Sequence, residues 1–204
     1  DVFIMAGNVA TAQAVRDLNE WGANSIKVGI SNGSCCSTNI VTGHGVPQFS
    51  AVLDCSYAAD QCGAHIVADG GIKTSGDIVK AFAAGSDLVM IGSLLSGTNE
   101  TPGKFIETSQ GKVKEYRGMA SSAAMSNRPD QNNTYTPTAE GVKALVSAKG
   151  SAIDIVNDLT KGLKSGMSYC NAFSIDDINI KASWGIRTMS GLHDGKPHIL
   201  GSAI

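Results

Sequence analysis

The chain has 204 residues, of which 42% are hydrophobic and 17% charged, so it is long enough to bury a substantial core. Its formal net charge of -2 gives no basis for binding nucleic acid or an anionic membrane surface. The apolar runs are far shorter than the roughly 20 residues of a membrane span, and the first residues lack the basic region of a signal peptide.

Four short apolar segments predict buried parallel strands, at residues 2–5, 25–28, 65–68 and 87–91. Glycine or polar turn residues follow each of them. Between them, helical spacing of apolar residues predicts helices at 11–21, 47–62 and 75–84. This alternation of strands and helices favours an α/β fold with right-handed parallel crossovers.

The pattern changes after Ser93. Residues 97–115 predict a hairpin, with turn residues at Pro102-Gly103 and Gln110-Gly111. Residues 126–137 are polar and show no periodicity, which predicts a mobile loop. A helix is expected at 153–164, and the C-terminal tail after it gives no clear pattern.

Glycine-rich segments follow three successive predicted strands, at residues 29–36, 69–71 and 92–93. In a parallel barrel all of these strand ends meet on one face, and glycine lets backbone N–H groups approach an anion closely. The alternative is that each segment is only a tight turn. Three in register favour a phosphate-binding role.

Asp69 ends the third predicted strand and precedes two glycines. It could cap a helix, but the next helix is expected to begin several residues later, near Thr74. A carboxylate at a strand end is well placed to accept two hydrogen bonds from a ribose diol. We therefore expect Asp69 to bind a ligand.

Cysteines provide the candidate nucleophile. There are five, an odd number with no C-x-x-C spacing, and the adjacent Cys35-Cys36 pair is a poor disulfide candidate, so a reducing, cytoplasmic setting is expected. Cys55, Cys62 and Cys170 suit buried structural roles. Cys35 and Cys36 lie in a polar, glycine-rich loop, where a thiolate with the Thr38 hydroxyl nearby could attack an electrophilic ring carbon. These residues alone leave open which of the two is the nucleophile.

Several segments together resemble the family of inosine-monophosphate dehydrogenase and guanosine-monophosphate reductase. They occur in the family's order and are Gly33-Ser34-Cys35-Cys36-Ser37-Thr38, residues 41–48, Asp69-Gly70-Gly71-Ile72, residues 92–98, Tyr116-Arg117-Gly118-Met119 and Glu140-Gly141. The resemblance implies a (β/α)8 TIM barrel, of which this chain supplies about the last four βα units plus a flap and a C-terminal segment. Residues 1–204 would then be the C-terminal part of one catalytic domain, with an inserted hairpin and mobile flap at about 97–150.

The resemblance also implies roles for individual residues. Cys36 would form a covalent adduct at purine C2, with Thr38 as its proton-transfer partner, while hydride passes to or from a nicotinamide cofactor. The phosphate would be held by Ser34, Gly71, Gly92, Ser93 and Tyr116. Asp69 and Gly70 would bind the ribose, and Gly118, Met119, Ala120 and Glu140 would face the base. The backbones of Gly33 and Cys36 would be ligands of a monovalent cation.

Departures from the family pattern affect the cation and the reaction. Ser31-Asn32 stands where the family has Gly-Pro, and Asn39 where it has Arg, which weighs against potassium dependence. Dehydrogenases carry an adjacent Arg-Tyr pair on a long flap, whereas Arg128 and Tyr135 are separated on a short one. The flap therefore favours the reductase. The reductase's glutamate partner for the threonine is expected where Ser122 stands, and is missing there.

Three functions remain in view. The leading hypothesis is a GMP reductase, which converts GMP to IMP and ammonia with NADPH. The alternative is an IMP dehydrogenase, which oxidises IMP to XMP with NAD, and the segments 116–119 and 100–103 favour it. A third hypothesis is a purine-nucleotide-binding protein without catalysis. A homotetramer is expected from the family, and the missing N-terminal half of the barrel is expected from the same or another chain.

Overall fold

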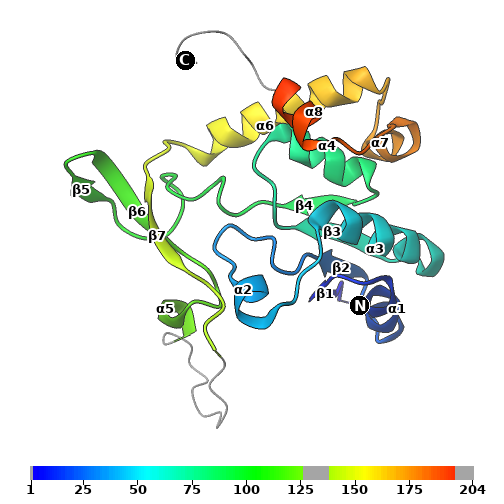
Figure 1. The fold of residues 1–204 in the computed structure, drawn as a ribbon, viewed down its shortest axis with the longest axis horizontal. Helices are drawn as coiled ribbons and strands as arrows, with labels where there is room; N and C mark the ends of the chain where they lie inside the picture. Colours follow the sequence, from blue (N-terminus) through cyan, green and yellow to red (C-terminus); the bar gives the residue numbers. More distant parts are fainter. Residues whose placement is uncertain (1, 126–137, 196–204) are drawn as a thin grey trace.

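The computed structural model describes residues 2–125 and 138–195. Two sheets organise them (Figure 1). The first is a parallel sheet in the order β1-β2-β3-β4, covered by helices. The second is the antiparallel sheet β5-β6-β7, which extends away from the body of the molecule.

The parallel sheet confirms three of the four predicted strands within two residues. Its strands are β1 (Met5–Val9), β2 (Ser25–Val28), β3 (His65–Asp69) and β4 (Leu88–Met90). The strand predicted at 2–5 is wrong, because β1 begins only at Met5, which pairs with Ser25. The side chains before it are not buried: Val2 is 84% exposed and Phe3 is 63% exposed. An apolar run identified a strand here but not its bounds.

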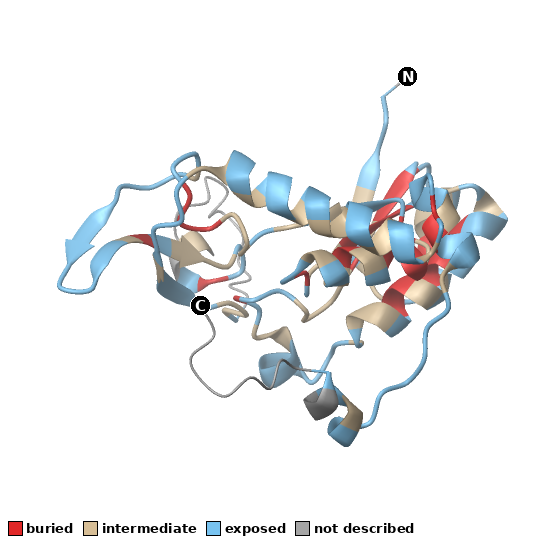
Figure 2. Ribbon diagram, turned by 90° about the horizontal axis from the view of Figure 1, so that it is seen from above, coloured by how far each residue is buried: buried red, intermediate tan, exposed pale blue. Residues whose placement is uncertain are grey.

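Three helices cover one face of this sheet, as predicted: α1 (Ala12–Glu20), α3 (Gln48–Cys62) and α4 (Ser75–Ala83). Their ends follow from local chemistry. The Thr11 hydroxyl caps α1, the left-handed Gly63 ends α3, and Thr74 with Asp77 forms a capping box on α4. The core lies between helices and sheet, in the red zone of Figure 2. Its members include Ile26, Val28, Ile66, Ala68, Val15, Val52 and Phe82.

The C-terminal helices pack on α4. The predicted helix at 153–164 is longer than expected and forms α6 (Ala152–Tyr169), which contacts α4. Gly162 and Gly166 permit this contact, because a Cβ on either would collide with Ser75 or Val79. The short helices α7 (Ile175–Lys181) and α8 (Met189–Asp194) were not predicted. A capping box of Ser174 and Asp177 begins α7 and was the missed signal.

The antiparallel sheet confirms the predicted hairpin in part. Its strands are β5 (Ile106–Thr108), β6 (Gly111–Arg117) and β7 (Lys143–Ser147). Two short helices, α2 (Thr38–Thr42) and α5 (Ser122–Met125), lie outside this sheet. The hairpin turns at Gln110-Gly111 as expected, whereas Pro102-Gly103 lies before β5. Sequence reasoning missed β7. The loop predicted at 126–137 lies outside the described residues.

Lys114 anchors this sheet to the loop after β4. Its side chain is only 3% exposed, and its ammonium donates to the backbone carbonyls of Thr98 (2.9 Å) and Thr101 (2.6 Å). It also lies 4.5 Å from the centre of the Phe105 ring. A buried cation paired with carbonyl oxygens holds the hairpin against the barrel loop.

We expect Lys114→Met to lower the free energy of unfolding by about 2–3 kcal/mol, because it leaves buried carbonyls without their charged donor. Urea denaturation followed by circular dichroism measures this. The matched control is Lys112→Met on the same strand, whose ammonium pairs with the exposed Glu107. That change should cost under about 0.5 kcal/mol. Equal midpoints for Lys114→Met and the parent would contradict the anchoring role.

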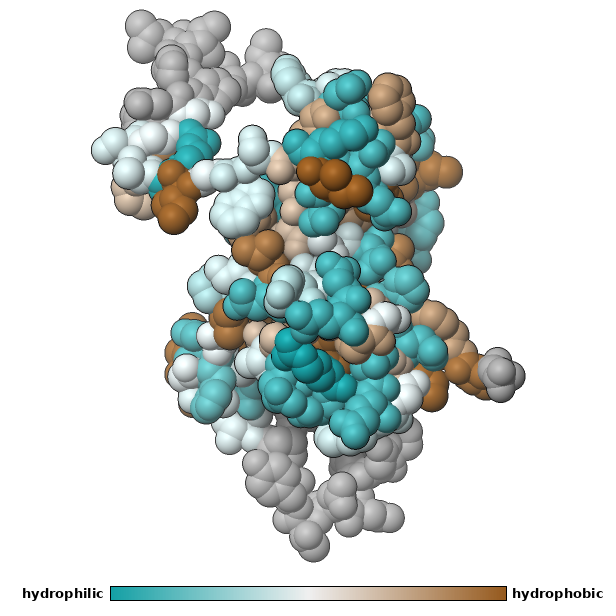
Figure 3. Space-filling view, turned by 90° about the vertical axis from the view of Figure 1, so that its right-hand side faces the viewer, coloured by the Kyte–Doolittle hydropathy of each residue, from teal (hydrophilic) through white to brown (hydrophobic). Residues whose placement is uncertain are grey.

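Within residues 2–125 and 138–195, no helix is both long and apolar enough to cross a membrane. The surface facing the viewer in Figure 3 is mostly polar, with apolar side chains in separate small areas.

Candidate active site

The loops after β2, β3 and β4 meet at the carboxyl edge of the parallel sheet, as expected for successive parallel strands. The loop after β2 touches the loop after β3. A Cβ on Gly70 would lie 3.3 Å from the Gly33 nitrogen, and one on Gly29 would collide with the Asp69 carbonyl. Both glycines have positive φ, so backbone freedom and close approach explain them together. The glycine-rich segments therefore bring these loops into contact.

Cys36, Thr38 and Glu140 form a continuous hydrogen-bonded chain. The Cys36 thiol donates to Thr38 Oγ1 over 3.2 Å, and the Thr38 hydroxyl donates to Glu140 Oε2 over 2.7 Å. Cys36 is exposed and Cys35 is buried. The geometry thus gives Cys36, rather than Cys35, a path for its proton to a carboxylate.

The backbone around Glu140 holds this carboxylate in place. Ser37 N donates to the Glu140 carbonyl (2.8 Å) and Val142 N donates to the Cys35 carbonyl (2.9 Å), which makes a short antiparallel bridge. On its other side, Glu140 N donates to the Ala120 carbonyl (2.9 Å). Glu140 therefore lies between the nucleophile loop and the segment after β6.

Two glycines make this close layering possible. A Cβ on Gly118 would lie 3.2 Å from the Cys35 Cβ, and a Cβ on Gly141 would lie 3.0 Å from Ser121 N. Both contacts are tighter than a side chain tolerates without movement of its neighbours. The structure thereby brings the predicted residues Gly118 and Ala120 beside the nucleophile loop.

The carboxylate that bonds Thr38 was not identified from the sequence. Reductases of the family have a glutamate where Ser122 stands, at the start of α5, and this chain lacks it there. In the structure the carboxylate bonded to Thr38 belongs to Glu140, for which sequence reasoning expected only a contact with the base. Thr38 and Glu140 are 102 positions apart, and no spacing rule connects them.

Asp69 lies at the end of β3 and is held by two donors that the sequence analysis missed. Lys27 Nζ and Asn8 Nδ2 each lie 2.9 Å from Asp69 Oδ2. Asp69 does not cap α4, because Thr74 does. Among the described residues nothing donates to the other carboxylate oxygen, Oδ1, which leaves it available to a ligand hydroxyl. The signal for Lys27 was a lone charge inside an apolar strand.

The residues expected around a phosphate are only partly connected by contacts. A Cβ on Gly92 would lie 3.3 Å from the Tyr116 hydroxyl. The Ser93 carbonyl accepts a hydrogen bond from Lys149 Nζ at 2.8 Å. Gly71 lies against Gln48, with 3.8 Å from its would-be Cβ to the Gln48 Cβ. Ser34 and Met119 are exposed.

The remaining cysteines differ from Cys36 in burial. Cys55 is buried, and burial together with the nearby Asp54 charge raises the pKa of its thiol to about 11. A thiol with such a pKa stays protonated and inert near neutrality. Cys62 and Cys170 are half-buried, so Cys36 is the one exposed cysteine of the five. Of the three cysteines expected in buried structural roles, Cys55 is buried, whereas Cys62 and Cys170 are only partly so.

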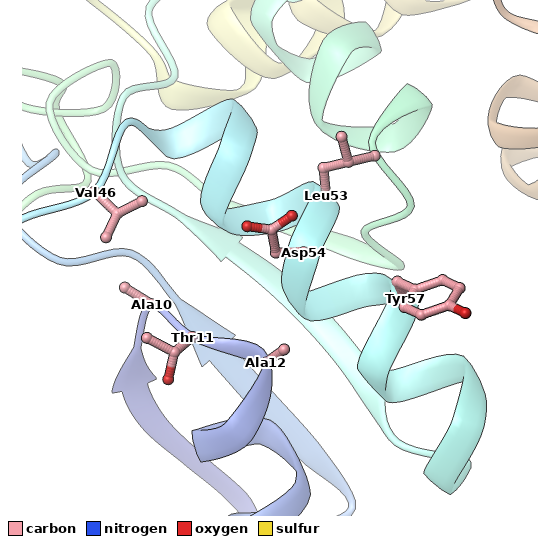
Figure 4. A pocket seen from close by; sticks show the side chains of 7 residues that line it. All are labelled: Ala10, Thr11, Ala12, Val46, Leu53, Asp54 and Tyr57. Carbon is pink, nitrogen blue, oxygen red and sulfur yellow. The ribbon is translucent and has the colours of Figure 1, made fainter.

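One cavity lies away from these groups. It encloses about 590 Å³ between the start of α1 and the outer side of α3, where Thr11, Asp54 and Tyr57 surround it (Figure 4). None of the predicted site residues lines it. Within the described part of the chain, no group of three His, Cys, Asp or Glu side chains could hold a metal ion. Side-chain chemistry, rather than cavity shape, identifies the site.

The chain is similar to known proteins along nearly its whole length. Residues 1–198 match the family model described as the IMP dehydrogenase / GMP reductase domain. The chain is 48% identical to an inosine-5'-monophosphate dehydrogenase from Halalkalibacterium halodurans, over 97% of this chain and 42% of that protein. It is 44% identical to a GMP reductase from Leishmania major, over 97% of this chain and 41% of that protein.

A solved structure extends the likeness to three dimensions. It is a GMP reductase from Trypanosoma brucei in complex with guanosine 5'-monophosphate, with a TM-score of 0.91 and 42% sequence identity. The match covers 98% of this chain and 42% of that one. The chain thus spans about two fifths of the length of its relatives, and its four βα units are half of a (β/α)8 barrel. The chain belongs to the IMP dehydrogenase and GMP reductase family.

Proposed function

We propose that the protein is a purine-nucleotide oxidoreductase of the reductase type, which converts GMP to IMP and ammonia with NADPH. The observation that supports this is the hydrogen-bonded chain from the Cys36 thiol through Thr38 to the Glu140 carboxylate. Loss of ammonia from purine C2 requires both a nucleophile at that carbon and a proton for the leaving nitrogen. The hydrogen-bonded chain supplies both the nucleophile and the proton.

In the proposed reaction, protons pass between Cys36 and Glu140 through the Thr38 hydroxyl. The Cys36 proton moves to Thr38 Oγ1 as the Thr38 proton moves to Glu140, and the thiolate adds to C2 of GMP. The same path then returns a proton to the 2-amino group, and the C2–N bond breaks to release ammonia. A hydride supplied by NADPH would form the new C2–H bond, and the C2–S bond breaks with its electron pair on sulfur to release IMP. The Cys36 thiolate left behind takes a proton from solvent, which restores the thiol. Glu140 ends each half-cycle in the form in which it began.

The substrate groups are assigned by the resemblance, and the geometry is compatible with them. Asp69, held by Lys27 and Asn8, would orient the ribose through Oδ1, with Gly70 beside it. Ser34, Gly71, Gly92, Ser93 and Tyr116 would hold the phosphate. Gly118, Met119 and Ala120 would face the base, since Gly118 and Ala120 contact or flank the Cys36 loop.

A nicotinamide cofactor would supply the hydride. The exposure of Cys36 fits this requirement, because the adduct at C2 must be open to a second reactant. We assign no residue of this chain to the rest of the dinucleotide. The departures at Ser31, Asn32 and Asn39 lead us to propose that potassium, through Gly33 and Cys36, is not required. A homotetrameric, cytoplasmic enzyme with a completed barrel remains the family-based proposal.

The runner-up is the IMP dehydrogenase reaction. It is favoured by the 48% identity to a dehydrogenase and by the segment 116–119. In the dehydrogenase reaction water releases the Cys36 adduct and no ammonia forms, so the path through Thr38 to Glu140 would have no leaving amine to protonate. Under the third hypothesis, nucleotide binding without catalysis, the same hydrogen-bonded path would have no chemical function.

We expect the complete protein to oxidise NADPH in the presence of GMP and to release ammonia in equal amount. The absorbance of the reduced cofactor and an ammonia assay measure this, with IMP plus NAD as the comparison. Turnover only with IMP plus NAD would overturn the reductase assignment. Nucleotide binding at roughly -8 kcal/mol, a micromolar affinity, with no turnover in either assay would favour the binding protein.

A further inference from the structure

The loop that carries Cys36 begins with a strained residue. Ser31 has φ of 73°, a left-handed value that is costly for a residue other than glycine. Its hydroxyl accepts a hydrogen bond from Asn39 N at 2.9 Å, in the first turn of α2, the helix that begins with Thr38. The side chain of Ser31 thus fixes where α2 starts.

Asn32, the next residue, joins its own loop to the segment 46–48 through one amide nitrogen. Its Nδ2 lies 3.1 Å from the Ile30 carbonyl, 3.0 Å from the Val46 carbonyl and 2.8 Å from Gln48 Oε1. An amide nitrogen carries two hydrogens, so these three oxygens share them. Asn32 is half-buried, which makes the loss of these bonds costly.

Gln48 extends this network to the strand ends. Its Nε2 donates to the Val28 carbonyl (2.9 Å) at the end of β2 and to the Asp69 carbonyl (3.3 Å) at the end of β3. Gln48 is also the first residue of α3. Asn32 is therefore connected, through one side chain, to the rigid edge of the parallel sheet.

The turn that holds Cys36 follows directly. Cys36 N donates to the Gly33 carbonyl (3.0 Å), and a Cβ on Gly33 would lie 3.5 Å from the Cys36 Cβ. Displacement of Asn32 would therefore displace the turn and lengthen the contact between Cys36 and Thr38. Because effective proton transfer needs hydrogen-bond contact, a small displacement has a large kinetic effect.

We propose that Asn32, acting through Gln48, is a positioning residue that holds Cys36 in contact with Thr38. The inference rests on the proposed role of Cys36, but it concerns two residues to which the proposed function assigns no part in the chemistry. It also gives a role to a departure from the family pattern: Asn32 supplies side-chain hydrogen bonds at a position where the family's proline has none.

The test uses the complete protein with Asn32→Ala, Asn32→Ser, Gln48→Ala and the Asn32→Ala/Gln48→Ala double variant. The control is Asn19→Ala, which removes another half-buried amide, in the last turn of α1, that donates to the Ala23 backbone carbonyl after the helix. Four quantities are measured: the melting temperature, the rate of Cys36 alkylation by iodoacetamide read by mass spectrometry, and kcat and KM for GMP.

We expect Asn32→Ala to lower kcat by about 10–100-fold with KM changed by under about threefold, because positioning is lost while binding groups remain. Cys36 alkylation should slow by at least about fivefold, since the thiol loses its path to Glu140. Cys55, with its raised pKa, should stay unlabelled in every variant. The double variant should be no worse than the single ones, because the two amides act as a unit.

Unchanged alkylation and kcat in Asn32→Ala, or equal losses in Asn19→Ala, would overturn the proposal. If Asn32→Ala does not fold, Asn32→Ser gives the same comparison with a smaller packing defect. Alkylation needs no substrate, so it decides the positioning role even if GMP is not turned over. A failure of the proposed function is thereby distinguished from a failure of this inference.

Discussion

Cys36→Ala is expected to reduce kcat with GMP and NADPH by about 10⁴-fold or more, because no other group can form the covalent adduct on which ammonia loss and hydride transfer depend. Binding of GMP should change by under about tenfold, since the phosphate and ribose groups remain. Steady-state rates and isothermal titration calorimetry measure the two effects separately.

The matched control for Cys36→Ala is Cys35→Ala. Cys35 is buried, and its contribution to the site is its backbone carbonyl, which accepts from Val142 N. That bond survives the substitution, so kcat should stay within about tenfold of the parent, with a modest loss of stability from the removed sulfur. If Cys36→Ala keeps more than about one hundredth of the parental kcat, the covalent mechanism is wrong.

Glu140→Gln should have the second largest effect, a loss of about 10²–10⁴ in kcat for GMP. The substitution keeps the size of the side chain and the backbone bonds to Ser37 and Ala120, but an amide cannot take the proton that Thr38 passes on. Thr38→Val should cause a similar loss. The double variant should be little worse than either single one, because residues that act as a unit are not additive.

Glu115→Gln is the control, because it removes another carboxylate, on β6, the strand that precedes Glu140 in the chain. Its carboxylate accepts a hydrogen bond from Lys143, whose ammonium lowers the Glu115 pKa, and it takes no part in the Cys36 chain. Turnover should therefore be unchanged. A Glu140→Gln enzyme that releases ammonia at the parental rate would show that the observed chain is structural, and would remove the main argument for the reductase.

The half-barrel was predictable because its signals are local. Short apolar runs such as residues 65–68, each followed by glycine or polar turn residues, predicted the strands, and the helical spacing of apolar residues predicted the helices. One missed element, α7, does carry a local signal, the capping box of Ser174 and Asp177, but others lack one. The β7 strand is mostly exposed and is stabilised by pairing with β6, and the helices α2 and α5 have only 5 and 4 residues, too few to show helical periodicity.

The site was predictable as a set of residues but not as an arrangement. A glycine-rich loop identified Cys35 and Cys36, yet only burial separates the exposed Cys36 from its neighbour. The partner of Thr38 and the donors to Asp69 come from other strands and loops, so no sequence spacing reveals them. Long-range pairing depends on the fold as a whole.

The short bridge around Glu140 also has a consequence for hydrogen exchange. The amides of Ser37 and Val142 are each bonded across the bridge, so neither can exchange with solvent deuterium unless the two segments separate. Their exchange rates therefore report the same opening from its two sides. That opening also separates Cys36 from its proton acceptor. The exchange rates of these two amides therefore measure how often the hydrogen-bonded chain from Cys36 to Glu140 is broken in the absence of substrate.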